Sequence, residues 1–340
     1  MVSGEYAVLQ GAPAISMAID CRARVTAESA ADAPFHSVIS PGLGDRKSEF
    51  RCTERGLVEW REDNRAQANR VDNCALLEHV WRQLQALPAQ SLTLTLDTRS
   101  FFDAESTLKL GFGSSSALAV ALTAALVRAG AAEVRARAAA RDIGESAAAA
   151  HASFQGGKGS GIDVATAVQG GVIAFSLRPE RRIRTLQWPA GLTASLWWSG
   201  KPASTVDRLK ELERFERNRA ARKSAARLMD ESRNVLDAWQ RAAAAGILGA
   251  LREYTAALRQ FSLEHALGVF DAGHQELCEI AEDYGFVYKP CGAGGGDIGI
   301  AFALQDASQK SIAEFGVRAG QLGFRRLEHS LETAGLIYEH

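Results

Sequence analysis

The spacing of hydrophobic residues divides much of the chain into helices and strands. Residues 91–97 alternate strictly between apolar and polar side chains, which predicts a half-buried strand. Residues 74–87 carry apolar side chains at helical spacing, and the alanine-rich stretches 114–128 and 133–153 predict two further helices. From about 205 to 270 the chain is strongly charged, and we predict that it is mostly helical with a solvated face.

Shorter apolar runs predict the other strands and one more helix. The expected strands cover 6–9, 14–19 with an extension over 22–25, 37–39 and 57–60 at sheet edges, 171–177, 192–198 and 297–304, and the expected helix covers 311–322. The polar stretch 178–187 separates the two halves of the chain. We therefore predict an N-terminal domain over 1–187 and a C-terminal domain over 188–340.

Composition narrows the class of protein. The chain has 340 residues, of which 46% are hydrophobic and 23% charged, which is ordinary for a soluble protein with two domains. A net charge of -1 gives no reason to expect nucleic acid or an anionic membrane as a partner. The five cysteines are scattered and odd in number, which is typical of a reducing compartment. The start of the chain lacks a signal-peptide pattern, so we expect a cytoplasmic protein.

A glycine–serine stretch is the first candidate for chemistry. Gly111-Phe-Gly113 is followed by Ser114, Ser115 and Ser116, where a helix is predicted to begin. A helix N-terminus offers unpaired N–H groups and a positive dipole end, which attract phosphate. A glycine turn with a serine cap is the alternative, and neither of the two standard phosphate-binding motifs fits.

Two further glycine-rich loops strengthen the case for a phosphorylated ligand. They cover 156–161 and 292–296, and each lies beside a predicted strand or helix. Such loops expose backbone N–H groups to anions. Asp163 follows the middle loop, where a carboxylate can orient or deprotonate an attacking hydroxyl; the alternative is an acid in the first turn of a helix.

The order of these motifs resembles the GHMP kinase superfamily, which contains galactokinase, homoserine kinase, mevalonate kinase and phosphomevalonate kinase. Gly4-Glu5-Tyr6-Ala-Val-Leu9, Lys109-Leu-Gly-Phe-Gly-Ser-Ser-Ser116 and Lys289-Pro-Cys-Gly-Ala-Gly-Gly-Gly-Asp297 resemble its first, second and third motifs. The resemblance covers essentially the whole chain. It implies an α+β GHMP kinase fold, with an N-terminal domain like ribosomal protein S5 domain 2 and a ferredoxin-like C-terminal domain.

Within the superfamily, the phosphomevalonate kinase family resembles this chain most. The pattern from His151 through Gln155-Gly-x-Lys158-Gly-Ser-Gly-x-Asp163 is similar to that family's, and so is Ser199-Gly-Lys-Pro-Ala-Ser-Thr205. Mevalonate kinases instead carry a glutamate for Mg²⁺ on the preceding helix, where this chain has Ala152. The implied reaction is ATP-dependent phosphorylation of 5-phosphomevalonate to 5-diphosphomevalonate in the mevalonate route to isoprenoids.

The resemblance also assigns roles to residues. ATP phosphates are expected at Gly111, Gly113 and the three serines, with Ser115 as a Mg²⁺ ligand; Asp163 and Lys109 are the expected catalytic residues. The acceptor is expected to contact the following residues: Ser160, Gly161, Lys201, Ser204, Thr205 and Ala293. The expected partner is a small phosphorylated molecule, and the expected assembly is a monomer or a homodimer.

Two alternatives to this function stay open. One is a mevalonate kinase or another GHMP small-molecule kinase. The other is a GHMP-fold protein that binds a ligand without catalysis. The second is motivated by a departure from the family pattern: an Ala-Pro-Gly-Lys-type strand normally precedes Gly-Glu-Tyr and its lysine reaches the acceptor, whereas the sequence printed here starts at Met1-Val-Ser-Gly. Either Met1 is an internal methionine or the chain has lost that lysine.

Overall fold

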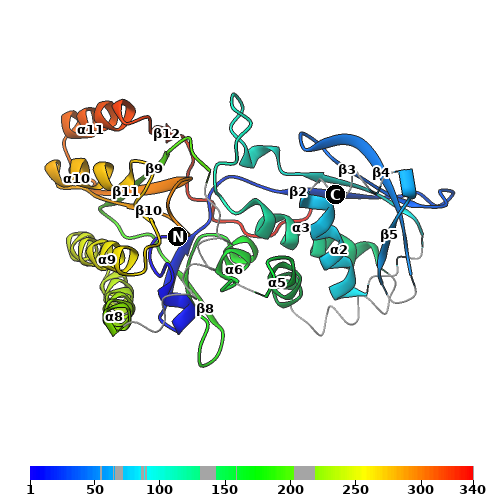
Figure 1. The fold of residues 1–340 in the computed structure, drawn as a ribbon, viewed down its shortest axis with the longest axis horizontal. Helices are drawn as coiled ribbons and strands as arrows, with labels where there is room; N and C mark the ends of the chain where they lie inside the picture. Colours follow the sequence, from blue (N-terminus) through cyan, green and yellow to red (C-terminus); the bar gives the residue numbers. More distant parts are fainter. Residues whose placement is uncertain are drawn as a thin grey trace. The chain divides into compact units, whose positions relative to one another are not determined.

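The structure is a computed structural model, and it divides the chain into two compact units. It describes residues 1–53, 56–63, 65, 72–85, 88, 90–130, 143–157, 159–202 and 219–339. The first unit consists of Met1–Asp20, Asp103–Phe112 and Gly170–Thr333, and the second of Cys21–Phe102, Gly113–Gln169 and Ala334–His340. Figure 1 labels their helices and strands. The units interleave along the sequence, and the single division at 187/188 stays a prediction.

The second unit is built on a five-stranded sheet. Its order is β2-β6-β3-β4-β5, with β3 and β6 parallel and the other neighbours antiparallel. The strands are β2 (Arg24–Ser29), β3 (His36–Ser40), β4 (Gly44–Cys52), β5 (Val58–Trp60) and β6 (Leu92–Asp97). Leu92, Leu94 and Leu96 of β6 are buried, which confirms the strand that alternation predicts there.

Among its described residues, this unit also contains the helices α2 (Asp72–Leu84), α3 (Ser114–Ala129), α5 (Ile143–Phe154) and α6 (Ile162–Gln169). Helix α3 packs against α2, α5 and α6. The buried face of α2 includes Trp81, whose ring meets Phe50 of β4 edge-on at 5.2 Å. Helix α5 accounts for the second half of the predicted helix 133–153; the first part of that range lies outside the described residues.

The first unit contains a four-stranded antiparallel sheet of order β10-β11-β9-β12. Its strands are β9 (Leu192–Trp198), β10 (Val287–Pro290), β11 (Ile298–Leu304) and β12 (Arg325–Leu327). Helices α8 (Arg219–Arg241), α9 (Ala244–Glu264) and α10 (His274–Asp283) precede β10, and α11 (Gln309–Gln321) precedes β12. This succession and strand order are those of a ferredoxin-like βαββαβ domain, as the resemblance implies.

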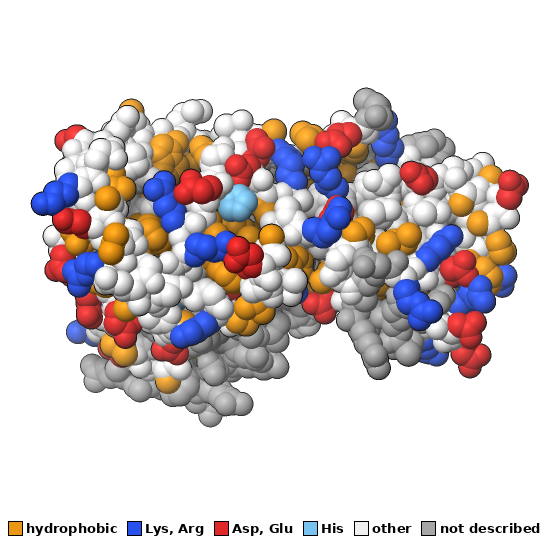
Figure 2. All heavy atoms as spheres, turned by 90° about the horizontal axis from the view of Figure 1, so that it is seen from above, with side chains coloured by type: hydrophobic (Ala, Val, Ile, Leu, Met, Phe, Trp, Pro, Cys, Tyr) orange, Lys and Arg blue, Asp and Glu red, His pale blue; other side chains and the backbone are white. Residues whose placement is uncertain are grey.

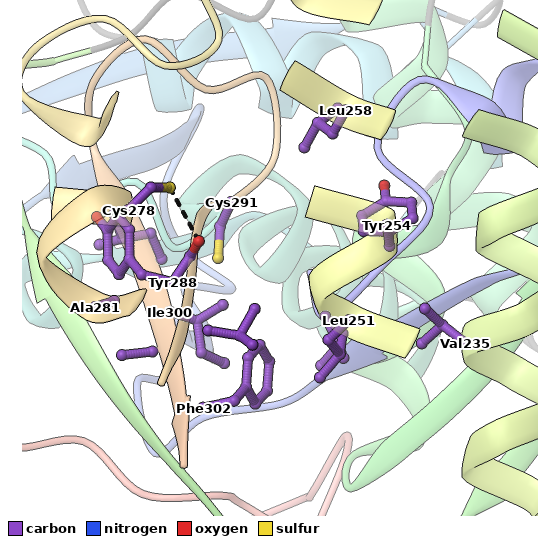
Figure 3. Close-up of a cluster of buried hydrophobic side chains, with 14 of the residues drawn as sticks. Val235, Leu251, Tyr254, Leu258, Cys278, Ala281, Tyr288, Cys291, Ile300 and Phe302 are labelled. Atoms are coloured by element: carbon purple, nitrogen blue, oxygen red, sulfur yellow. Dashed lines mark hydrogen bonds between the residues drawn. The ribbon is translucent and has the colours of Figure 1, made fainter. Parts of the chain in front are cut away.

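A continuous core lies between this sheet and the helices of the same unit. In Figure 3, Leu251 of α9 lies across from Phe302 of β11, with Ile300 beside Phe302, and Tyr254 and Leu258 lie farther along α9. In the same view the Cys278 thiol of α10 donates a hydrogen bond to the Tyr288 carbonyl at 3.0 Å. The core is thus closed by contacts between α9, α10 and the sheet.

A smaller antiparallel sheet of order β1-β7-β8 also belongs to the first unit. Its strands are β1 (Ala14–Met17), β7 (Val172–Ser176) and β8 (Arg182–Leu186). Strand β8 lies inside the polar stretch that we took as the link between domains. Both of its arginines are exposed, and β8 pairs with β7 as an edge strand that has no fully buried residue.

Two predictions about the N-terminal strands were wrong. Residues 7–10 form the 3₁₀ helix η1 (Ala7–Gln10), because Tyr6 adopts a φ of 61° and Gly11 ends the turn in a left-handed conformation. Residues 24 and 25 belong to β2 in the second unit and do not extend β1.

The surface mixes charges of both signs. In the view of Figure 2, basic and acidic side chains are interspersed over the described residues. This arrangement agrees with the near-zero net charge. None of the helices that the structure describes has both the length and the apolar character needed to cross a bilayer.

Candidate active site

Helix α3 begins with a glycine that brings its first turn close to Asp163. Gly113 is the N-cap residue, with a φ of 78°, a left-handed conformation that favours glycine. A Cβ atom added to Gly113 would lie 3.1 Å from Ser116 Oγ and 4.0 Å from Asp163 Cβ. Gly113 carries no side chain to cap the helix, so the amide groups of the first turn are available to an anion.

Two of the three serines make different contacts. Ser116 is buried, and its hydroxyl donates to the Gly113 carbonyl at 2.7 Å, which fixes the turn. Ser115 Oγ lies 2.9 Å from His151 Nε2 of helix α5. Ser114 and Ser115 are half-buried. Ser116 therefore shapes the loop, whereas Ser114 and Ser115 have side chains that a ligand can reach.

The His151 side chain is buried beneath this loop. Burial lowers the pKa of the imidazole below 6.5, and the negative charge of Asp163 opposes that shift. The ring is consequently neutral at pH 7, with one nitrogen as donor and one as acceptor. Within the second unit, Ser115, His151 and Asp163 thus surround the start of α3.

Asp163 lies in the first turn of α6, and its side chain is exposed. The Ser160 hydroxyl accepts a hydrogen bond from the Ile162 amide at 3.3 Å, and Gly161 has a φ of 75°. Ser160 and Gly161 therefore shape the turn that presents Asp163. Their contact with an acceptor stays a prediction.

In the first unit, the second and third glycine motifs meet. Gly111 has a φ of 87°, and an added Cβ atom would lie 2.4 Å from Asp297 Cβ. The Asp297 amide donates to the Lys201 carbonyl at 2.6 Å, and the Asp297 carbonyl accepts from the Ser199 amide at 2.9 Å. Gly111, Lys201 and the end of the third motif are therefore neighbours.

The first motif reaches the same region. The Tyr6 hydroxyl donates to the Ala293 carbonyl at 2.6 Å. Ala293 is half-buried, and the loop before it starts at Lys289 of β10, which is fully buried. The structure thus brings residues of all three motifs together within the first unit.

The remaining predicted site residues either have exposed side chains or lie outside the described residues. The side chains of Lys109 and Lys201 are exposed. Ser204 and Thr205 lie outside the described residues, as does Lys158. The first unit contains Lys109, Gly111, Lys201 and Ala293. The second unit contains Gly113 to Ser116, Ser160, Gly161 and Asp163.

The residues around α3 fit a magnesium ion that is shared with a nucleotide. Mg²⁺ in such sites takes one or two protein oxygens and completes its shell with phosphates and water. The Ser115 hydroxyl and the Asp163 carboxylate are oxygen ligands of this kind near the phosphate-attracting end of α3. Among the described residues there is no group of three or more acidic, histidine or cysteine side chains that could hold a metal alone.

Sequence reasoning missed two residues of this region. His151 was part of a family pattern, but no role followed from its place on an alanine-rich helix. Asp297 closes the third motif, and its φ of 52° is unusual for a residue with a side chain. The only sequence signal for Asp297 was its position directly after three glycines.

Comparison with known proteins establishes the family. The model described as "GHMP kinases N terminal domain" matches residues 75–171. A curated phosphomevalonate kinase from Streptomyces sp. (strain CL190) is 32% identical over 342 residues, covering 91% of this chain and 88% of that protein. The chain belongs to the GHMP kinase family. The superfamily resemblance inferred from the three motifs is thereby confirmed.

Solved structures agree with this GHMP kinase fold. A Lin0012 protein from Listeria innocua superposes with a TM-score of 0.78 at 22% identity, covering 97% of this chain and 94% of that one. Phosphomevalonate kinase from Streptococcus pneumoniae, in complex with phosphomevalonate and AMPPNP, gives a TM-score of 0.70 at 16% identity, covering 97% and 96%. At sequence identities of 22% and 16%, these similarities show a shared fold and nothing further.

Proposed function

We propose that this chain transfers the terminal phosphoryl group of ATP to the phosphate of 5-phosphomevalonate, giving 5-diphosphomevalonate and ADP. The observation that carries the choice of acceptor is the 32% identity to a phosphomevalonate kinase over 91% of the chain. The pattern from His151 to Asp163 supports the same choice, because it resembles that family more than mevalonate kinases.

The nucleotide phosphates bind at Gly111, Gly113 and the first turn of α3. Its free amide groups and dipole favour the negative charge of the phosphates. Ser115 would hold Mg²⁺, and the ion would supply positive charge to neutralise the phosphates. Lys109 adds a positive charge for the transferring group, since stabilisation of charge is what this reaction requires from the protein.

Asp163 orients the acceptor. An oxygen of the acceptor phosphate attacks the terminal phosphorus of ATP, and the bond from that phosphorus to the bridging oxygen breaks to release ADP. A phosphate with a second pKa near ~6 is largely deprotonated at neutral pH, so little base catalysis is needed. Asp163 therefore acts mainly by placing the acceptor, its cationic neighbours or Mg²⁺.

The acceptor is held by residues of the middle and third loops and of the segment after β9. They are Ser160, Gly161, Lys201, Ser204, Thr205 and Ala293. Two observations within the first unit support Lys201 and Ala293: Lys201 is joined to Asp297 by a backbone hydrogen bond, and Ala293 is joined to Tyr6 of the first motif. A lysine and several small polar residues suit a phosphorylated acceptor.

A coupled assay of ADP release tests this function. The purified chain is incubated with Mg²⁺, ATP and, in turn, phosphomevalonate, mevalonate, homoserine or galactose, with EDTA as the control for metal dependence. We expect the highest kcat/KM with phosphomevalonate. Turnover of mevalonate without turnover of phosphomevalonate would favour a mevalonate kinase, and nucleotide binding without turnover of any acceptor would favour a non-catalytic protein.

A further inference from the structure

Metal binding by Ser115 would require its contact with His151 to have one direction, with the serine hydroxyl as the donor. Ser115 Oγ and His151 Nε2 are 2.9 Å apart, and they come from α3 and α5, 36 residues apart in sequence. A hydroxyl that coordinates Mg²⁺ uses an oxygen lone pair for the metal, so its hydrogen must be donated elsewhere. A neutral imidazole nitrogen at this distance is a suitable acceptor.

The His151 ring is held in place for this contact. Its side chain belongs to the buried residues of α5, and its ring stacks on Phe154 at a centroid distance of 6.3 Å. Helix α5 also packs along α3. The ring nitrogen therefore reaches Ser115 from a buried side chain.

We infer that His151 is a positioning residue for nucleotide-bound magnesium: its Nε2 accepts the Ser115 hydroxyl proton in a hydrogen bond and turns the hydroxyl oxygen toward the metal. This inference rests on the proposed function, since it assumes that Mg·ATP binds at the start of α3. It goes beyond that function, because it gives His151 a role in orienting the metal ligand Ser115 without contact between His151 and the metal or the nucleotide. Partners of metal ligands commonly change metal affinity 10–100-fold when they are removed.

The alternative is that His151 merely fills space between α3 and α5. The chain offers a control for that alternative in a second histidine that contacts helix α5. His79 Nδ1 of α2 lies 2.9 Å from Ser153 Oγ of α5, and the His79 ring also contacts Phe154, at a centroid distance of 5.9 Å. His79→Ala therefore removes a histidine–serine hydrogen bond and a contact with Phe154, but leaves Ser115 untouched.

The test measures binding of AMPPNP by calorimetry, once with Mg²⁺ and once with EDTA, without any acceptor. For His151→Ala we expect affinity about tenfold lower with Mg²⁺ and changed less than about twofold with EDTA. His151→Gln, whose amide oxygen can accept the same hydrogen bond, should recover most of the loss. His79→Ala should bind like the unmodified protein under both conditions.

A double variant separates positioning from packing. Ser115→Ala should lower Mg²⁺-dependent affinity, and adding His151→Ala should lower it by no more than about a further twofold, because the two residues act through one contact. If His151→Ala does not fold, His151→Asn replaces it, since its side chain is polar but too short to reach Ser115.

Three results would overturn the inference: an equal loss with Mg²⁺ and with EDTA, no loss, or losses that multiply in the double variant. An unmodified protein that binds no AMPPNP would overturn the proposed function as well. Failure to phosphorylate phosphomevalonate would leave the inference standing, because no acceptor takes part in the binding measurement.

Discussion

The Lys289 ammonium group lies 2.5 Å from a carboxylate oxygen of Glu5, and neither side chain is exposed to solvent. The Tyr254 hydroxyl donates to the other Glu5 oxygen at 2.7 Å and accepts from the Gly4 amide at 2.8 Å. This buried network joins the first motif to β10, directly before the third glycine-rich loop. It explains why Tyr6 and Ala293 can meet.

Breaking this ion pair should destabilise the protein strongly. Lys289→Met leaves the Glu5 charge buried without a partner, for which we expect a loss of about 3–5 kcal/mol in the free energy of unfolding, measured with urea. Lys289→Met combined with Glu5→Gln should lose clearly less. The control is Lys310→Met, because Lys310 forms an exposed pair with Glu314 at 3.8 Å. Equal losses for Lys289→Met and Lys310→Met would show that the buried pair has no special role.

Gly111 should tolerate no side chain. Gly111→Ala places a Cβ atom 2.4 Å from Asp297 Cβ and forces alanine into a φ of 87°. Gly292→Ala is the control, since its φ is 63° and nothing lies within 4 Å of the added atom. The left-handed conformation costs about 1–2 kcal/mol in both variants, and the clash with Asp297 is added only in Gly111→Ala. Gly111→Ala should therefore lose more stability than Gly292→Ala and weaken nucleotide binding. Similar losses in both variants would contradict the close approach of Gly111 to Asp297.

His274 should make stability depend on pH. Its Nδ1 lies 2.7 Å from the Tyr288 hydroxyl and its Nε2 lies 3.0 Å from the Gly296 carbonyl, at the end of the third glycine loop. Burial lowers the pKa of His274 to about 4, although the hydrogen bond to Gly296 raises it in part. The unfolded chain binds this proton near pH 6.5 and the folded chain does not. Stability from His274 is therefore present above pH 6.5 and falls as pH drops toward 4.

The size of this effect can be isolated with one variant. Between pH 7 and pH 5 the unmodified protein should lose roughly 2 kcal/mol more than His274→Phe, measured by urea unfolding at both values. Phenylalanine keeps a ring against Phe324 but cannot titrate. Parallel losses in the two proteins would mean that His274 is protonated in the folded state at pH 5.

Asp163→Asn keeps the shape of the side chain and removes its charge. We expect kcat to fall by about 100-fold, with nucleotide affinity roughly preserved, because the carboxylate acts on the acceptor or the metal during transfer. The control is Glu145→Gln, since Glu145 is the exposed acid in the first turn of α5. An Asp163→Asn protein as active as the Glu145→Gln protein would reduce Asp163 to a first-turn acid.

The spacing of apolar residues predicted those helices and strands whose own sequence contains a buried apolar face. The alternation of 91–97 became β6 and the serine–alanine run became α3. It failed where pairing with a neighbour compensates for polar residues: β8 contains two arginines, and no strand was predicted over β4, which contains Arg46, Lys47 and Glu49. Backbone hydrogen bonds to the preceding strands, β7 and β3, hold these two segments, and such pairing does not require an apolar face that periodicity could reveal.

Only those parts of the candidate site that belong to a single sequence motif could be predicted. The loop at 111–116 and Asp163 came from local pattern and resemblance, and the structure brings Asp163 beside Gly113. The contact of Ser115 with His151 depends on how α3 packs against α5, which no local pattern encodes. The close approach of Gly111 to Asp297 likewise needs the folded first unit.

The identity of the phosphorylated product tests the central claim most directly. The chain is incubated with phosphomevalonate, ATP and Mg²⁺, and the purified product is examined by phosphorus NMR. Transfer to the acceptor phosphate creates a phosphorus–oxygen–phosphorus link, so we expect two mutually coupled phosphorus signals. Two uncoupled monoester signals would mean that the phosphoryl group went to a hydroxyl, which would contradict the account. A protein that phosphorylates mevalonate but not phosphomevalonate would contradict it as well.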